Sequence, residues 1–398
     1  MEQDIRKVLL VSVESPWWQE ALEAATAMPA IPAWLTNEYI CSIDEEYALL
    51  GNRRNLVLDA LSRVVSDPTL CTFAKALYYI IGLKKGYKHA FTQFHLSKTA
   101  ESNLAGLFPI LGHVAPSCET LSKRGVPADV IFDTLLFLRR SLSRSLDAET
   151  PRFGEIPFSY FPLYLYTDNL FMGRLRFEIH PEADRNVSIF ADRSGDICIL
   201  MQDTRLHVSG NRLGSIGCTD ETGSFDADFV ETDAYYEGYA VNKETGLVEN
   251  NRTRLFKGQW QRLFAPGDTL LKVHIPYGGK LTKEACHASY EKARKVYRTC
   301  YPEYDFKGFV CDTWLLCPLM GSFLPKESNI LQFQSDYRIF PAQNNAQDVL
   351  HYVYSIDVPS ADLVDANSLP EDNSMRRGVK NLLLKGQYIH QFNGFIPF

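Results

Sequence analysis

The 398-residue sequence lacks several patterns that would assign it to a class at once. Its nine cysteines are odd in number and include no C-x-x-C pair, which argues against a disulfide framework. No apolar run approaches the roughly 20 residues that a membrane-spanning helix needs, and the apolar stretch in MEQDIRKVLLVSVESPWW is far shorter. We therefore expect reduced thiols, no secretory signal, no membrane insertion and a cytoplasmic location.

Massed positive charge and familiar metal patterns are also missing. The formal net charge is −7 and the lysines and arginines are scattered, so no general nucleic-acid surface is expected. There is no HExxH, and the acidic stretch from 213 to 239 does not follow the calcium-loop pattern. We interpret that stretch as a solvated loop or an acidic rim that attracts a cationic acceptor, with a metal loop as the alternative. Its carboxylates are Asp220, Glu221, Asp226, Asp228, Glu231 and Asp233.

The first part of the sequence contains a series of helical patterns. Residues 1–168 carry apolar positions at three-to-four spacing, which predicts a helical N-terminal domain. The predicted helices run from Trp17 to Ala27, Glu45 to Val65, Pro68 to Leu83 and Pro127 to Leu146. Three histidines of this part, His89, His95 and His113, are expected to be surface or hydrogen-bonded residues rather than ligands.

The character of the sequence changes near Leu170. Strand-like runs bounded by Gly, Asp and Asn follow, and helical stretches alternate with them, so residues 169–398 are expected to form an α/β-type domain with a mixed sheet. The whole chain is thus predicted to be α+β. Within this part we predict strands at 308–316 and 348–358, helices at 325–337 and 372–386, and a final strand at the C-terminus.

The most informative stretch is LLKVHIPYGGKLTKEACHASYEKARKVY, residues 270–297. The run from Leu270 to Ile275 predicts a strand, Gly278 and Gly279 predict a turn, and Thr282 is a plausible N-cap for the helix that follows. The start of such a helix has unpaired backbone N–H groups and a positive dipole, so the turn is suited to an anion such as a pyrophosphate. An ordinary strand–helix connection is the alternative, because neither G-x-G-x-x-G nor G-x-x-x-x-G-K-[ST] is present.

Ordered blocks of the chain resemble a family of bacterial acyltransferases that have an N-terminal helical N-acyltransferase domain and a C-terminal GNAT-like domain. The blocks are GVPADVIFDTL, FMGRLRFE, YYEGYAVNKETGLV, WQRLFAPGDTLLKVHIPYGGKLTKEACHASYEKA, FVCDTWLL and LPKESNILQFQ. They extend from about residue 125 to 334, and the block around HIP-x-GG is the most specific.

The resemblance implies a GNAT-like core in which acyl-CoA, either acetyl-CoA or another acyl-CoA, lies between two splayed parallel strands. LLKVHIP would be the fourth strand, residues 283–300 the next helix and GFVCDTWLL the fifth strand. YGGKLT stands where the usual loop reads [QR]-x-x-G-x-[GA]. The residues implied to bind the pyrophosphate are Tyr277, Gly278, Gly279, Lys280, Leu281 and Thr282.

Candidate catalytic residues flank this turn. His274, at the end of the strand, is a candidate base for the amine proton, with a structural histidine as the alternative. Cys311 and Asp312 point to opposite faces of their strand, so only one of them can face the cleft. Glu327 and Asn329 follow that strand and could orient an amine acceptor, with helix capping by Ser328 or Asn329 as the alternative.

Three functions follow from these residues. The first is an acyl-CoA-dependent N-acyltransferase that moves an acyl group, expected to be acetyl, to an unknown amine by direct attack. The second is a cysteine-dependent acyl hydrolase or amidase that uses Cys311 with His274. The third is a GNAT-like module that binds a ligand and catalyses nothing.

Overall fold

The structure is a computed structural model that describes residues 16–83, 100–147, 165–166, 169–180 and 186–398. The chain divides into two compact units, Met1–Met172 and Gly173–Phe398, each of which is described below by itself. Within the described ranges, no helix has the length and apolar character needed to cross a membrane. His89 and His95 lie outside these ranges.

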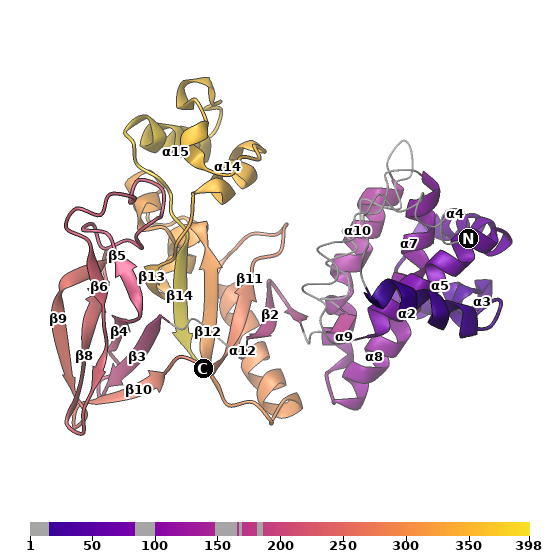
Figure 1. The fold of residues 1–398 in the computed structure, drawn as a ribbon, viewed down its shortest axis with the longest axis horizontal. Coiled ribbons are helices and arrows are strands. Elements are labelled where there is room, and N and C mark those ends of the chain that lie inside the picture. The colour runs from indigo at the N-terminus through magenta and orange to yellow at the C-terminus, as the bar shows by residue number, and fades with distance from the viewer. Residues whose placement is uncertain (1–15, 84–99, 148–164, 167–168, 181–185) are drawn as a thin grey trace. The chain divides into compact units, whose positions relative to one another are not determined.

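The first unit is helical, as the apolar spacing predicts (Figure 1). Helix α5 shows why: its apolar positions bury one broad face, and α2 and α7 pack against it. Asp67 caps α5 by accepting hydrogen bonds from the amides of Thr69 and Leu70. The described α-helices of this unit are α2 (Pro16–Ala27), α3 (Asn37–Tyr47), α4 (Arg54–Ser66), α5 (Pro68–Gly82), α7 (Ala100–Gly112), α8 (Val114–Lys123), α9 (Ala128–Thr134) and α10 (Leu136–Leu146), with short 3-10 helices at Ala33–Leu35 and Gly51–Arg53.

Two of the predicted helices in this unit are wrong in extent. The predicted helix from Glu45 to Val65 is in fact the end of α3 and the whole of α4, because Ala48 adopts φ 50 and terminates α3. The buried Asp44 carboxylate holds this break by accepting from the amide of Leu50 and from Arg54 Nε, both at 2.6 Å. The predicted helix at 127–146 likewise divides at Leu135 into α9 and α10.

His113 is a buried, hydrogen-bonded residue, as expected. Its Nε2 donates to the carbonyl oxygen of Tyr78 at 2.8 Å, and its Nδ1 accepts from the Tyr166 hydroxyl. The ring stacks on Tyr78, with centroids 4.0 Å apart. Burial lowers the pKa of His113 to about 4, so the ring is neutral near pH 7.

The second unit is built around a six-stranded mixed sheet, which confirms the predicted fold class. Strands β11 (Thr269–His274) and β12 (Phe306–Thr313) run parallel at its centre. The pairs β11–β2, β12–β14 and β13–β14 are antiparallel. The sheet order is β1 (Leu170–Met172, the last residues before the boundary at Gly173), β2 (Leu175–His180), β11, β12, β14 (Phe392–Pro397) and β13 (Arg338–Pro341).

A second sheet covers one face of the central sheet. Leu270, Val310 and Phe395 of the central sheet share one hydrophobic core with residues of β3 and β4, such as Ile189 and Ile199. This sheet has the order β10 (Trp260–Phe264), β3 (Val187–Asp192), β4 (Ile197–Met201), β8 (Tyr235–Val241) and β7 (Val230–Glu231), with β9 (Val248–Phe256) on β8; β5 (Thr204–Leu206) and β6 (Phe225–Ala227) form a separate pair.

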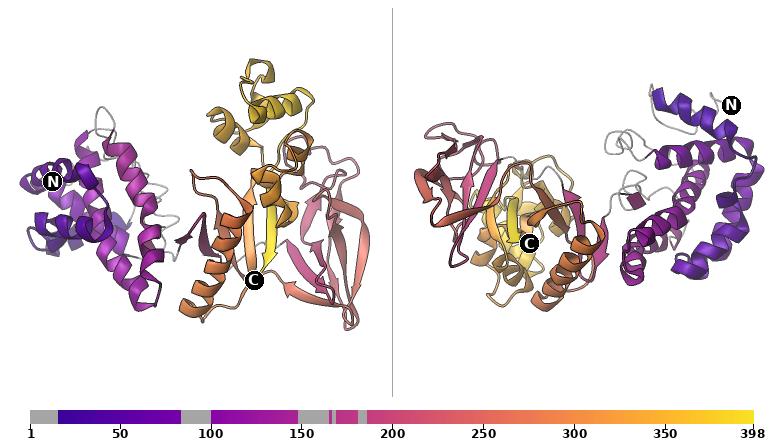
Figure 2. Two further views of the ribbon diagram at one scale, coloured as in Figure 1. Left: turned by 180° about the vertical axis from the view of Figure 1, so that it is seen from behind. Right: turned by 90° about the horizontal axis from the view of Figure 1, so that it is seen from below.

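Helix α12 (Lys283–Cys300) covers the opposite face of the central sheet, as Figure 2 shows. The Tyr297 hydroxyl donates to the carbonyl of Phe177 at 2.8 Å, and the ring of Tyr290 lies 5.2 Å from that of Phe309. The central sheet is therefore packed on both faces. Both the helix span 283–300 and the N-cap at Thr282 agree with the prediction, since Thr282 Oγ1 accepts from the amide of Ala285.

Three helices follow β12: α13 (Asn329–Ser335), α14 (Gln347–Tyr354) and α15 (Ser374–Leu384). The strand predicted at 348–358 is wrong: residues 348–354 belong to α14, whose buried Val349, Leu350 and Tyr354 have helical spacing, and residues 355–358 form no regular element. The strand predicted at 308–316 ends early, at Thr313, and continues as a 3-10 helix, Trp314–Leu316. Short 3-10 helices also occur at Pro318–Ser322, Ala361–Leu363 and Ala366–Ser368.

Candidate active site

The parallel pairing of β11 and β12 stops before β12 ends. The register runs from Thr269↔Phe306 to Val273↔Cys311. Strand β12 then continues to Thr313, but its partner there is β14. We use the name β11–β12 fork for the place where the two strands end. It lies between His274, the last residue of β11, and the last two residues of β12. The fork lies at the carboxyl ends of two parallel strands, where α/β folds commonly bind ligands.

The predicted glycine turn begins directly after β11. Gly278 and Gly279 have φ 89° and 74°, a backbone region that favours glycine. Residues 277–280 are exposed, and the Tyr277 side chain is 88% accessible. The turn leads into the amino end of α12, where Thr282 caps the first turn. The residues expected to bind a pyrophosphate are thus brought together, in an exposed turn at the positive end of an 18-residue helix.

Arg174, which the sequence reasoning did not single out, holds this turn in place. Its Nη1 donates to the carbonyl of Pro276 at 2.9 Å, and its Nε donates to the carbonyl of Lys280 at 3.2 Å. Arg174 lies in the turn between β1 and β2, about a hundred residues away in sequence. The block FMGRLRFE contains it, but no local pattern indicates that its side chain reaches the glycine turn.

His274 is held at the fork by a carboxylate that was also missed. Its Nε2 lies 2.8 Å from Glu178 Oε2 on β2. Because a carboxylate only accepts, Nε2 carries the hydrogen, and in the neutral ring Nδ1 has the lone pair. Glu178 pairs with Lys272 in register, and His274 pairs with Arg176, so all four side chains share one face of the sheet. The arrangement is a histidine with a fixed tautomer beside two cations.

The pKa of His274 lies below its ordinary value. Burial of the ring is the main cause, the hydrogen bond to Glu178 opposes it, and the positive charges of Arg176 and Lys272 lower the pKa further. The imidazole is therefore neutral near pH 7. A neutral ring with its lone pair on Nδ1 can accept a proton, which is the chemistry required of a general base.

Asp312, and not Cys311, shares the face of His274. In the parallel register Cys311 lies opposite Val273, so it points away from His274, whereas the next residue, Asp312, points to the same side. Gln391 Nε2 donates to Asp312 Oδ1 at 2.6 Å. The fork thus presents a neutral histidine on one strand end and a hydrogen-bonded carboxylate on the other.

Cys311 is buried on the α12 side of the sheet, and its accessible fraction is 1%. Burial raises the pKa of its thiol far above the ordinary value. A nucleophilic thiolate is therefore disfavoured at this position. The geometry gives no support to a cysteine hydrolase, because the thiol and His274 lie on opposite faces of the sheet.

The other two sequence candidates lie at the start of α13. Glu327 is exposed and precedes the helix, and Asn329 is its first residue. Ser328 Oγ accepts from the amide of Leu331, so the capping alternative is correct for Ser328. Helix α13 packs on α12 and on the 3-10 helix Trp314–Leu316. A role for Glu327 and Asn329 in holding an acceptor remains a prediction.

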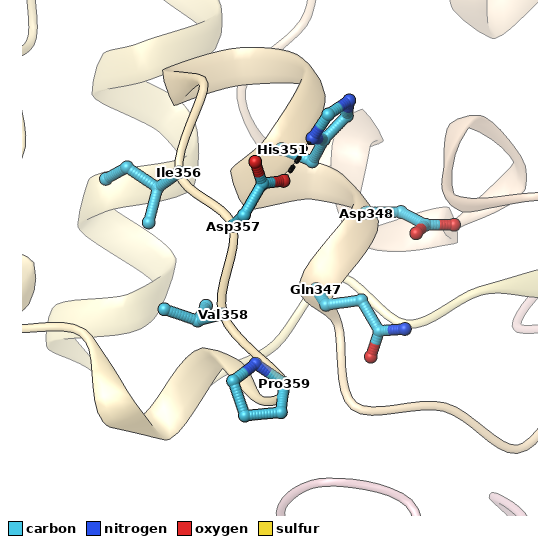
Figure 3. Close-up of a pocket in the computed structure, with 7 residues that line it drawn as sticks. All are labelled: Gln347, Asp348, His351, Ile356, Asp357, Val358 and Pro359. Carbon is cyan, nitrogen blue, oxygen red and sulfur yellow. Dashed lines mark hydrogen bonds and ion pairs between the residues drawn. The ribbon is translucent and has the colours of Figure 1, made fainter. Parts of the chain in front are cut away.

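A surface cavity of about 390 Å³ lies at α14 (Figure 3). His351 Nδ1 and Asp357 Oδ1 are 2.5 Å apart on its wall. Trp314, which follows β12, stacks on Tyr352 of the same helix, with centroids 6.4 Å apart. The cavity shares no residue with the fork or the glycine turn and contains none of the residues singled out from the sequence.

The acidic stretch at 213–239 is largely paired within the second unit. Asp228 binds Arg252, and Glu231 binds both Lys257 and Arg262. The partners of Asp228 and Glu231 lie in or next to β9 and β10, and Glu221 binds Arg205 of β5. Glu221, Asp228 and Glu231 therefore neutralise nearby cations, which weakens the idea of an acidic rim for a cationic acceptor.

With this geometry in view, the family is clear. The family model described as "GNAT-like C-terminal domain" matches residues 170–396, more than half of the chain. The chain belongs to this family. The helical first unit and the GNAT-like second unit together give the architecture that the sequence resemblance implies.

Solved structures that share the fold of this chain include acyltransferases. One, an acyltransferase in complex with decanoyl-CoA, has a TM-score of 0.61 and 16% identity over 100% of this chain and 99% of the other. A mutant acyltransferase in complex with octanoyl-CoA gives the same values. A third, in complex with decanoyl-CoA and teicoplanin, has a TM-score of 0.60 and 16% identity over 99% and 98%. At this identity the likeness shows the fold. None of the curated proteins matches the chain by sequence.

Proposed function

We propose that the protein is an acyl-CoA-dependent N-acyltransferase whose reaction takes place at the β11–β12 fork. The observation that carries the proposal is that the parallel pairing ends at Val273↔Cys311, directly beside the glycine turn. An acyl-CoA bound at the fork would have the pyrophosphate of its CoA part at the glycine turn and its thioester carbonyl near His274 and Asp312. The similar structures named above contain acyl-CoA in this fold, which supports the choice of donor.

The residues at the fork suit direct transfer. The amine nitrogen attacks the thioester carbonyl, a carbon–nitrogen bond forms, and His274 Nδ1 takes the proton that the amine loses. The carbon–sulfur bond then breaks, and the departing CoA thiolate receives a proton from the imidazolium. Asp312, fixed by Gln391, would hold the ammonium form of the acceptor, which releases one proton to solvent before the neutral amine attacks. Glu178 stabilises the imidazolium while it exists.

The proposal predicts that acyl-CoA stabilises the protein through the glycine turn. Acetyl-, octanoyl- and decanoyl-CoA, a series that includes the chain lengths held by similar structures, should each be tested for a rise in melting temperature. Gly279→Asp should remove the rise, because it places a carboxylate and a strained φ at the turn. Gly267→Asp is the matched control, since Gly267 also has a positive φ but lies at the other end of β11 with open space around it.

The outcomes separate the remaining alternatives. No rise with any of the three thioesters would sink the proposal. A rise accompanied by release of the CoA thiol in the presence of a panel of amines supports an acyltransferase. A rise without thiol release would instead favour a GNAT-like module that binds acyl-CoA and catalyses nothing.

A further inference from the structure

The glycine turn carries no arginine of its own, but one is delivered to it from a distant element. The segment PYGGKLT contains one lysine as its only cation. Arg174 donates to the carbonyls of Pro276 and Lys280, which stand on either side of the two glycines with positive φ. Two carbonyl oxygens of the turn are therefore directed toward a guanidinium.

The other end of Arg174 is fixed as well. Its backbone N–H donates to Ser289 Oγ at 2.9 Å, and that hydroxyl donates to the carbonyl of Ala285 in the first turn of α12. Gly173, with φ 69, brings the chain so close that a Cβ there would lie 3.2 Å from Ser289 Oγ. The backbone of Arg174 is thus held by the helix and its guanidinium by the turn, so little rotamer freedom remains to be lost when a ligand binds.

This arrangement makes the electrostatic potential at the turn more favourable for an anion. Carbonyl oxygens repel a phosphate, and those of Pro276 and Lys280 are occupied by the guanidinium. The guanidinium also adds a positive charge beside Gly279, where a Cβ would lie 3.7 Å from Arg174 Cδ. Both effects favour an anion at the exposed amides of the turn, and neither acts on an uncharged part of a ligand.

We propose that Arg174 is a positioning residue that makes the site select thioesters carrying a pyrophosphate over those that lack one. This inference rests on the proposed function. It concerns the part of the donor that is bound, not the chemistry at the fork. It predicts that the affinity contributed by the pyrophosphate depends on Arg174, whereas the affinity for the acyl-pantetheine portion does not.

The test compares two donors that differ only beyond the pantetheine arm. Decanoyl-CoA and S-decanoyl-pantetheine are titrated into the full-length protein by calorimetry. Arg174→Gln should raise the Kd for decanoyl-CoA about tenfold, the loss expected for charge-assisted hydrogen bonds, and leave the Kd for S-decanoyl-pantetheine within about twofold. The Kd of Arg174→Lys for decanoyl-CoA should lie between those of the unaltered protein and Arg174→Gln. An ammonium keeps the positive charge, but unlike the planar guanidinium it cannot bind both carbonyls.

Arg193→Gln is the matched control. Arg193 also donates to a turn carbonyl, that of Gly258, but in the second sheet, and its loss should change neither Kd. Equal weakening of both donors by Arg174→Gln would show a structural role only and overturn the inference, as would no weakening of either. If the unaltered protein binds neither donor, the proposed function itself fails, and this result differs from all the others.

Discussion

His274 and Glu178 illustrate how two residues acquire a joint role through pairing. They are almost a hundred positions apart in the sequence, yet neighbouring strands bring His274 Nε2 to 2.8 Å from the Glu178 carboxylate. The contact fixes the tautomer, so the nitrogen with the lone pair is Nδ1. The sequence pointed to His274 from its place before the glycine turn, but it held no sign of which carboxylate would orient the ring.

The first prediction concerns the pH dependence of this pair. The pKa of His274 lies below its ordinary value of 6.5, chiefly through burial, so kcat/KM should be constant above that pH and fall as the pH drops through the lower value. Glu178→Gln keeps an oxygen that accepts from Nε2 but removes the charge that raises the pKa, so the fall should move to lower pH. His274→Ala should lower kcat about 100-fold or more.

The measurement is a pH profile of CoA thiol release for the three proteins. Binding of decanoyl-CoA serves as the control, because neither substitution touches the glycine turn. An acid limb that stays in place in Glu178→Gln would contradict the role given to the carboxylate.

At the scale of an element, the start of α12 has a structural role and, in the proposed function, also a binding role. Thr282 Oγ1 accepts from the amide of Ala285 at 3.3 Å, and the same first turn provides the amides and dipole that would face a phosphate. The cap and the helix span follow from local sequence, since a polar residue precedes a run with strict helical spacing. The element was therefore predicted correctly.

We predict that Thr282→Ala lowers the free energy of unfolding of the second unit by about 1 kcal/mol, the usual effect of losing an N-cap, and also weakens decanoyl-CoA binding. Thr282→Ser should restore both. Asn373→Ala provides the matched comparison: Asn373 caps α15 by accepting from the amide of Arg376, so its loss should lower stability by a similar amount without changing the Kd. Equal effects of the two variants on binding would argue against a role for the α12 amino end.

Other elements show where local pattern was insufficient. The segment at 348–358 is rich in β-branched and aromatic residues and was predicted as a strand, yet most of it forms α14 because burial of Val349, Leu350 and Tyr354 requires a helix. The helix break at Ala48 was not predicted for a related reason. It depends on a buried carboxylate, Asp44, that binds Leu50 and Arg54, and the apolar spacing runs through it without a gap.

At the scale of the whole molecule, each unit contains a buried neutral histidine. His113 in the first unit and His390 in the second both have a pKa lowered to about 4 by burial. In the unfolded chain each would have a pKa near 6.5. Below that value the unfolded chain takes up protons that the folded chain does not, so the stability present above pH 6.5 is lost as the pH falls toward 4.

The corresponding prediction is a loss of stability in mild acid. Between about pH 6.5 and 4, the free energy of unfolding should fall by roughly 1 kcal/mol per pH unit for each of these histidines. Urea unfolding followed by circular dichroism at pH 7, 6 and 5 measures the slope. His113→Gln should make the transition of the first unit less dependent on pH, whatever its effect at pH 7. A transition of unchanged slope in that variant would contradict the assignment.

The sequence alone was enough for the features that depend on near neighbours in the chain. The helical first part, the mixed α/β second part, the turn at Gly278 and Gly279 and the helix 283–300 all follow from periodicity, glycine conformation and capping. Their physical causes act over a few residues. They are therefore visible in the order of the amino acids, as is the family resemblance that the GNAT-like match confirms.

Tertiary structure decided which side chains meet. The register of β11 against β12 places Asp312 and not Cys311 on the face of His274, and a shift of one residue would have reversed this. The pairing of β2 with β11 supplies Glu178, and the β1–β2 turn supplies Arg174 to a segment a hundred residues away. Such contacts depend on sheet pairing across long separations, because only packing of the whole unit selects one register among many.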